Sequence, residues 1–199
     1  MAVAERSRKR PPEVLTSEEV RALIGTCSNR APTGIRNRAL IAVLWRCGLR
    51  VGEALALEPR DADLDAGTLR VRHGKGDRSR TVGLDDGTQA LIAHWLDRRQ
   101  RLGINGRRRL FCTLDGHTLA QSYVRHLLRR LATKAGIERR VHPHWLRHSY
   151  AAELAREGTP MNVLRDALGH SSLATTDRYL RDVAPVHVIE TMRRREWEL

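Results

Sequence analysis

The sequence has no long apolar segment. Although 41% of its 199 residues are hydrophobic, no apolar run approaches the roughly 20 residues that a membrane-spanning helix needs. The first ten residues are charged and lack an apolar core, so we expect no secretion signal there. We therefore expect a globular protein of one domain, or of one domain with a small appendage, that has no membrane partner.

Cysteine is scarce as well. The three cysteines, Cys27, Cys47 and Cys112, lie far apart in the chain. Their positions match neither the spacing of a zinc site nor the paired pattern of a disulfide framework. We therefore expect a protein of the reducing cytoplasm.

Lysine and acidic residues are few in comparison with arginine. Only three of the 36 basic residues are lysines, and the 23 acidic residues leave a formal net charge of +13. Such an excess predicts an anionic partner, most often nucleic acid. A basic protein without such a partner would have the same composition, so composition alone leaves that alternative open.

Helical patterns fill most of the chain. Residues 5–12 are basic and contain prolines, which indicates a linker. Thr16 with Glu19 forms the pattern of a capping box, which predicts a helix through about Thr26. A break at residues 47–48 separates two further helices, and the last helix is expected over residues 184–196. The remaining predicted helices cover residues 87–101, 119–135, 143–157 and 160–168.

Strand patterns occupy a small part of the chain. Residues 68–72 and 81–84 alternate apolar and other side chains. The connection at residues 73–78 contains two glycines and is typical of a hairpin loop. A further short strand is expected near residues 109–113. The predicted fold class is therefore mainly α with a small antiparallel β-sheet (α+β).

A histidine and an arginine share one face of a predicted helix. His144 and Arg147 are three residues apart and therefore lie on the same side of the helix. The pair means little alone, because arginine is abundant and His126 with Arg129 has the same spacing on another helix.

Four longer segments carry more information. Residues 47–55 read CGLRVGEAL, residues 73–78 form the hairpin around Lys75, residues 142–154 read HPHWLRHSYAAEL, and residues 168–180 read LGHSSLATTDRYL. In this order and at these spacings they resemble the catalytic domain of the tyrosine recombinase (phage integrase) family. The resemblance spans about residues 14–183 and implies that family's catalytic fold.

The resemblance implies an enzyme that cleaves and rejoins double-stranded DNA through a 3′-phosphotyrosyl intermediate, without a metal or any other cofactor. It also implies a homo-oligomer, from dimer to tetramer, on DNA. The positions that match the family's catalytic residues are Arg50, Lys75, His144, Arg147, His170 and Tyr179.

The chemistry requires residues of these types. Two arginines can bind the non-bridging phosphate oxygens by bidentate hydrogen bonds, and His170 can donate another. A tyrosine hydroxyl has a pKa of about 10 and needs a base, for which His144 is the candidate. Lys75 is the candidate acid for the leaving 5′-oxygen. We expect Glu53 to pair with Arg50 and to orient it.

Each assignment has a structural alternative. Arg50 would then form only an ion pair with Glu53, Lys75 would be a solvated turn residue, and His170 would be a helix cap or a buried hydrogen-bonding group. The other tyrosines, Tyr123 and Tyr150, are expected to be packed aromatic residues.

The helix predicted over residues 119–135 has one apolar and one basic face. The residues expected to point inward are Val124, Leu127, Leu128 and Leu131. The residues expected to contact DNA phosphates are Arg125, Arg129, Arg130 and Lys134. A solvated basic face is the alternative.

Two other functions stay open at this point. One is a type IB topoisomerase-like enzyme, and the other is a DNA-binding remnant that accompanies a complete recombinase. Most members of the family carry a helical DNA-clamping domain before the catalytic one, whereas residues 1–13 form only a basic arm here. We therefore expect weak, poorly specific DNA binding, whether the chain is naturally minimal or a piece of a longer protein. Residues 184–199 are expected to dock on a neighbouring protomer.

Overall fold

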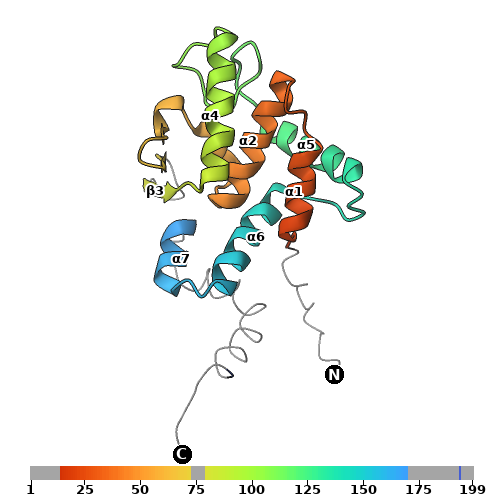
Figure 1. Cartoon of the computed structure of the whole chain (residues 1–199), viewed down its shortest axis with the longest axis vertical. Coiled ribbons are helices and arrows are strands. Elements are labelled where there is room, and N and C mark those ends of the chain that lie inside the picture. Colours follow the sequence, from red (N-terminus) through yellow and green to blue (C-terminus); the bar gives the residue numbers. More distant parts are fainter. Residues whose placement is uncertain (1–13, 73–78, 170–192, 194–199) are drawn as a thin grey trace, which may run out of the picture.

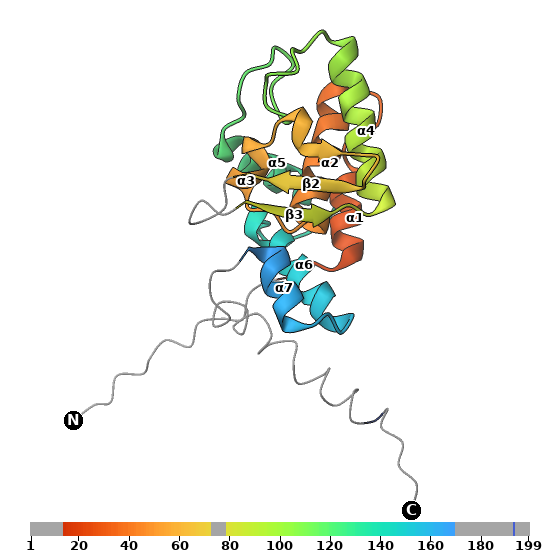
Figure 2. The same cartoon turned by 90° about the vertical axis from the view of Figure 1, so that its left-hand side faces the viewer.

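The structure is a computed structural model that describes residues 14–72, 79–169 and 193. These residues form a mainly helical fold with one three-stranded antiparallel sheet, as expected (Figures 1 and 2). The helices are α1 (Ser17–Gly25), α2 (Pro32–Arg46), α3 (Val51–Ala56), a 3-10 turn (Pro59–Asp61), α4 (Asp86–Arg101), α5 (Gln121–Lys134), α6 (Pro143–Arg156) and α7 (Met161–Leu168). No helix in the described ranges is long and apolar enough to cross a membrane.

Helix α2 lies at the centre of the fold. From Gly34 to Trp45, every residue except Arg38 is buried. A helix that is buried all round needs neighbours on every side, and α1, α3, α4 and α6 pack against α2 (Figure 1). The position of its C-terminal end is therefore fixed by most of the core, and the candidate site begins at that end.

The break between α2 and α3 occurs where it was predicted, and it has two causes. Gly48 adopts the left-handed conformation with φ +58°, which glycine enters without steric cost. A Cβ on Gly48 would also lie 2.3 Å from Cδ1 of Tyr150. Tyr150 is thus the packed aromatic residue that was expected, and burial raises the pKa of its hydroxyl.

The sheet has the strand order β1-β2-β3, with β1 at Ala62–Asp63, β2 at Thr68–Val71 and β3 at Arg80–Gly83. Strands β2 and β3 pair with Leu69 opposite Val82, and both side chains are buried in the core. Both predicted strands are confirmed. Strand β1 was not predicted because two residues are too short to show an alternation. The predicted linker at 5–12, hairpin loop at 73–78 and last helix at 184–196 lie outside the described residues.

The strand predicted near residues 109–113 is wrong. Only one isolated bridge, between Cys112 and Thr118, occurs there. Leu110 donates its N–H to Leu57 O at 2.7 Å, and its carbonyl accepts a hydrogen bond from Trp95 Nε1 at 2.8 Å. The carbonyl of Cys112 is bound by the Arg36 side chain at 2.9 Å. These backbone N–H and carbonyl groups therefore find hydrogen-bond partners in side chains and a loop, so the segment needs no neighbouring strand.

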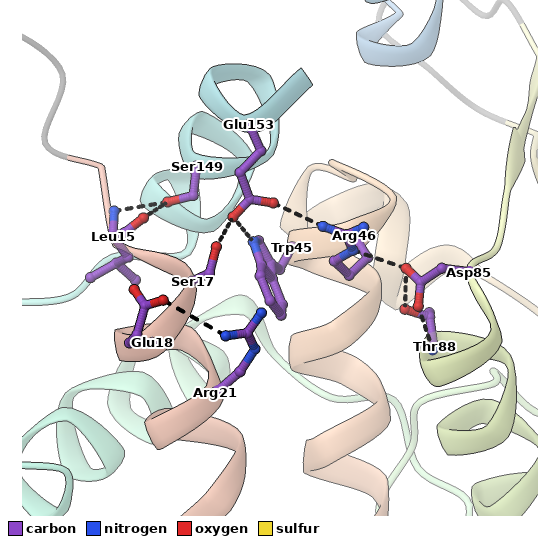
Figure 3. A network of polar contacts seen from close by, with 10 residues as sticks. All are labelled: Leu15, Ser17, Glu18, Arg21, Trp45, Arg46, Asp85, Thr88, Ser149 and Glu153. Atoms are coloured by element: carbon purple, nitrogen blue, oxygen red, sulfur yellow. Dashed lines mark hydrogen bonds and ion pairs between the residues drawn. The ribbon is translucent and has the colours of Figure 1, made fainter. Parts of the chain in front are cut away.

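A polar network anchors helix α6 to the rest of the fold (Figure 3). Glu153 on α6 accepts hydrogen bonds from Ser17 Oγ, Trp45 Nε1 and Arg46 Nη1, each at 2.9 Å. Arg46 also donates from Nε to Asp85 at 2.9 Å, and Asp85 caps α4. One carboxylate thus joins α6 to α1 and α2, and Arg46 extends the connection to α4.

A second contact on α6 holds the start of the described chain. Ser149 Oγ accepts a hydrogen bond from Leu15 N at 2.8 Å and donates one to Leu15 O at 2.9 Å (Figure 3). The backbone N–H and carbonyl of Leu15 are therefore both hydrogen-bonded to one buried hydroxyl.

We predict that Gly48→Ala destabilises the protein by about 2–4 kcal/mol, because it adds both a left-handed alanine and a clash with Tyr150. Gly103 also has a positive φ (+67°) but no atom within 4 Å of an added Cβ, so Gly103→Ala should cost only about 1 kcal/mol. Gly25→Ala, where neither cause applies, should change stability by less than about 0.5 kcal/mol. Urea unfolding measures all three, and equal losses for Gly48→Ala and Gly103→Ala would contradict a role for the Tyr150 ring.

Candidate active site

Arg50 lies directly after the break, as the N-cap of α3. Its backbone N–H donates to Glu53 Oε2 at 2.9 Å, and its Nη1 donates to Glu53 Oε1 at 2.7 Å. The predicted ion pair is therefore present. Glu53 binds both the backbone and the side chain of Arg50, so the guanidinium is held in one orientation while 29% of its side chain stays exposed.

Arg80, the first residue of β3, binds the same carboxylate. Its Nη1 and Nη2 donate to the two oxygens of Glu53 at 3.2 and 2.8 Å, and its Nε donates to the Ala167 carbonyl at 3.2 Å. The side chain is only 11% exposed. Arg80 was not among the predicted site residues, because one arginine among so many carries no signal of its own, although only Ser79 separates it from the Lys75 hairpin.

Arg147 on α6 is the third arginine of the group. Its side chain is 1% exposed, and its Nη1 lies 3.9 Å from Glu53 Oε2. It donates from Nη1 to the carbonyl of Gly48 at 2.6 Å and from Nη2 to the carbonyl of Leu168. Arg147 therefore connects the end of α2, the end of α7 and the shared carboxylate.

The electrostatics of Glu53 follow from these contacts. Burial alone would raise the pKa of its carboxyl group, but hydrogen bonds and positive charge from Arg80 and Arg50 lower that pKa from 4.5 to about 2. The Glu53 carboxylate is therefore ionised throughout the neutral range. It balances part of the charge of three neighbouring arginines, which would otherwise repel one another.

The C-terminal end of α7 is held by two of these arginines. Arg80 and Arg147 bind the carbonyls of Ala167 and Leu168, which are among the groups that a helix leaves unpaired at its end. Positive charge at this end is also favoured by the helix dipole. Gly169 closes the helix in the left-handed conformation, with φ +61°.

His144 stands in the first turn of α6 and is exposed beside Arg50. Its ring meets that of His148 edge to face, with the centroids 4.4 Å apart. Partial desolvation lowers the pKa of the His144 imidazole, and the charges of Arg147 and Arg50 lower it further. The imidazole is therefore mainly neutral at pH 7, which is the form that can accept a proton.

A cleft of about 650 Å³ opens at this group of residues. It lies between α3, α5 and the start of α6. Its lining combines apolar residues such as Leu49 and Val51 with the polar or charged residues Arg50, Glu53, Gln121, Arg125, His142 and His144. Arg50 and Arg125, beside the neutral His144, fit an anion with several oxygens, such as a phosphodiester.

Helix α5 has the two faces that were predicted. The four expected inward residues, Val124, Leu127, Leu128 and Leu131, are buried. The four expected DNA-contacting residues, Arg125, Arg129, Arg130 and Lys134, are exposed. Of these, Arg125 reaches the wall of the cleft. His126 is exposed on this helix and lies outside the cleft lining, so its match to the His-x-x-Arg spacing carries no meaning.

The structure thus brings together Arg50, Glu53, His144 and Arg147 of the predicted site, and it adds Arg80. Three predicted catalytic residues, Lys75, His170 and Tyr179, lie outside the described residues. Tyr123 is half-buried, and its hydroxyl bonds with Arg36 and Asn37, so it is a structural residue as expected.

Sequence comparison identifies the family. A model of the phage integrase family matches residues 13–184, and the chain belongs to this family. It is 35% identical over 181 residues to the tyrosine recombinase XerC of Xanthomonas axonopodis pv. citri, covering 89% of this chain and 58% of that protein. It is 37% identical over 188 residues to XerA of Thermococcus kodakarensis, covering 89% of this chain and 63% of that protein. The chain therefore spans about three fifths of the length of these relatives.

Solved structures agree on the fold. The crystal structure of XerA recombinase superposes with a TM-score of 0.82 at 31% identity, over 95% of this chain and 68% of the other. A post-cleavage complex of XerH site-specific recombinase with a palindromic difH substrate gives 0.75 at 31% identity, over 92% and 54%. The catalytic domain of bacteriophage HP1 integrase gives 0.61 at 22% identity, over 91% and 94%, and supports the fold alone.

We predict that Glu53→Gln lowers the free energy of unfolding by about 3 kcal/mol at pH 7, since a carboxyl pKa reduced from 4.5 to about 2 is worth that much. Because the folded-state pKa is depressed, this stabilisation is complete above about pH 4.5 and is lost as the pH falls towards 2. The difference between wild type and variant should therefore shrink over that range. Glu138→Gln, at an exposed position, is the control, and a pH-independent deficit of Glu53→Gln would contradict the prediction.

Proposed function

We propose that this chain is the catalytic part of a tyrosine recombinase that cleaves and rejoins double-stranded DNA through a 3′-phosphotyrosyl intermediate at Tyr179. The observation that carries the proposal is the presence of Arg50 and His144 in the lining of one cleft, with the buried Arg147 joined to Arg50 through the shared Glu53 carboxylate. These are the three described residues that match the family's catalytic positions. Membership of the family supports the reaction type.

Arg50 and Arg147 are proposed to stabilise the charge that builds on the non-bridging oxygens. Within the described residues, the Arg50 side chain donates to Glu53 through Nη1, and a guanidinium has five donors. Donors therefore remain for a phosphate in the cleft. Arg147 adds a second positive charge from the buried side, where electrostatic interactions are stronger than in water.

The remaining steps are proton transfers. Neutral His144 is proposed to accept the proton of the Tyr179 hydroxyl as it attacks phosphorus, and Lys75 to protonate the leaving 5′-oxygen. His170 is proposed to donate a hydrogen bond to the phosphate. Because the phosphotyrosine ester conserves the energy of the phosphodiester bond, rejoining is the reverse of these steps and needs no ATP.

We also propose how the chain is organised. Residues 1–13 would form a basic arm, residues 14–183 the catalytic domain, and residues 184–199 a helix that docks on a neighbouring protomer. This implies a homo-oligomer on DNA, acting in the cytoplasm. The basic face of α5 is proposed to bind the duplex backbone, since its four cations are exposed and phosphates are the usual partners of such a face.

We predict that wild-type protein, incubated with nicked suicide duplexes taken from the sequences flanking its gene, forms an SDS-resistant protein–DNA adduct. Tyr179→Phe lacks the nucleophilic oxygen and should form none, while Tyr150→Phe should still form it because Tyr150 packs against Gly48. Gel electrophoresis after denaturation gives the result. DNA binding without any adduct would refute the enzyme and favour a DNA-binding remnant. Plasmid relaxation without exchanged strands would indicate a topoisomerase.

We predict that Arg129→Ala/Arg130→Ala lowers the slope of log Kd against log salt concentration by about 2, since each lost phosphate contact removes about 0.9. The matched control is Arg21→Ala/Arg101→Ala, which removes the same charge from exposed positions on α1 and α4 that pair with Glu18 and Asp97. Fluorescence anisotropy with a labelled duplex measures both. If the two double variants change the slope equally, α5 is only a solvated basic face.

A further inference from the structure

Arg80 occupies the position where three parts of the site meet. It begins β3, directly after the hairpin that contains Lys75. It binds both oxygens of Glu53, which holds Arg50, and it also binds the last turn of α7 at Ala167 O. None of the catalytic matches in the sequence includes it.

We propose that Arg80 is a positioning residue that aligns Arg50, through Glu53, with the C-terminal end of α7. This rests on the proposed function, in which Arg50 acts together with His170 and Tyr179. All three nitrogens of the Arg80 guanidinium donate to Ala167 O or to Glu53, so we assign Arg80 no direct contact with the phosphate. Its effect is therefore exerted on the groups that do bind the phosphate.

The geometry requires an arginine. The guanidinium presents Nη1 and Nη2 to the two carboxylate oxygens and turns Nε towards a carbonyl in a different direction. A planar fork with fixed donor directions can satisfy all three acceptors, whereas a lysine ammonium is a point charge at the end of a flexible chain. Gly169 accommodates this fork, because a Cβ there would lie 2.8 Å from Arg80 Nη1.

The groups that face Glu53 come from three elements. Arg50 faces it from the start of α3, Arg80 from β3 and Arg147 from α6. Glu53 also lines a small pocket together with Asp61 and Arg72, which pair with each other. Without Arg80 the carboxylate stays buried but loses its strongest hydrogen-bonding partner, so its pKa should rise.

The first test measures the protein without DNA. Carbon-13 NMR follows the titration of the Glu53 carboxyl in the full chain, with Glu53→Gln to assign its signal. In Arg80→Met the pKa of Glu53 should rise by more than about one unit. In Arg80→Lys it should stay closer to the wild-type value, because the charge is retained. Arg46→Met is the matched control, since Arg46 also bridges two carboxylates, Glu153 and Asp85, but away from the site.

The second test measures adduct formation on a suicide duplex as a function of pH. Arg80→Met should bind the duplex with a Kd close to that of wild type but form the adduct about 10- to 100-fold more slowly, the usual cost of losing a group that orients a catalytic residue. The ratio of variant to wild-type rate should fall further as the pH drops and Glu53 becomes protonated. Taking the ratio cancels the titration of His144, which both proteins share. Arg80→Lys should restore the pH dependence of the wild-type protein but only part of its rate.

The outcomes separate the two proposals. An unchanged pKa of Glu53 in Arg80→Met overturns the positioning role whether or not the protein cleaves DNA. A raised pKa with unchanged cleavage at every pH also overturns it. If Arg46→Met shows the same pH-dependent loss, the effect of Arg80 is one of general stability and the role fails again. If wild type forms no adduct, the proposed function fails, and the carboxyl titration still decides whether Arg80 controls Glu53.

Discussion

One buried carboxylate, Glu53, is the interaction on which the candidate site depends. Three arginines from α3, β3 and α6 lie within 3.9 Å of its oxygens. Neither the carboxylate nor the buried arginines would be stable there alone, because an unpaired buried charge costs several kcal/mol. The carboxylate allows three like charges to gather beside one cleft, and a phosphate in that cleft would then meet positive charge that is already in position. Preorganisation of this kind is commonly the largest contribution that a protein makes to catalysis.

The ends of two helices complete this arrangement. Helix α2 is fixed by the core around it and ends two residues before Gly48, and helix α7 ends directly before Gly169. Each glycine has a positive φ, and an added Cβ would meet a neighbouring side chain closely. The carbonyls at or just before these glycines accept hydrogen bonds from Arg147. The buried arginine therefore donates to one carbonyl in the turn after α2 and to one that the end of α7 leaves free, so the turns of the chain help to set the position of the charge.

The sequence was informative wherever a local rule determines the structure. The capping box at Thr16, the break at Gly48 and the period of α5 could all be predicted, since each depends on residues close in the chain. Arg80 could not be predicted, because its importance arises from contacts with Glu53 and Ala167, 27 and 87 residues away. The strand predicted near Leu110 was wrong for a related reason. Its apolar residues read as a strand, yet its backbone is satisfied by Trp95 and Arg36, whose side chains no local pattern connects with it.

The contact between Leu15 and Ser149 has a mechanical consequence. Ser149 lies two residues after Arg147 on the same helix, and its hydroxyl is hydrogen-bonded to both polar atoms of the Leu15 backbone. A force applied to the backbone at Leu15 would therefore reach the helix that carries Arg147 through these two hydrogen bonds.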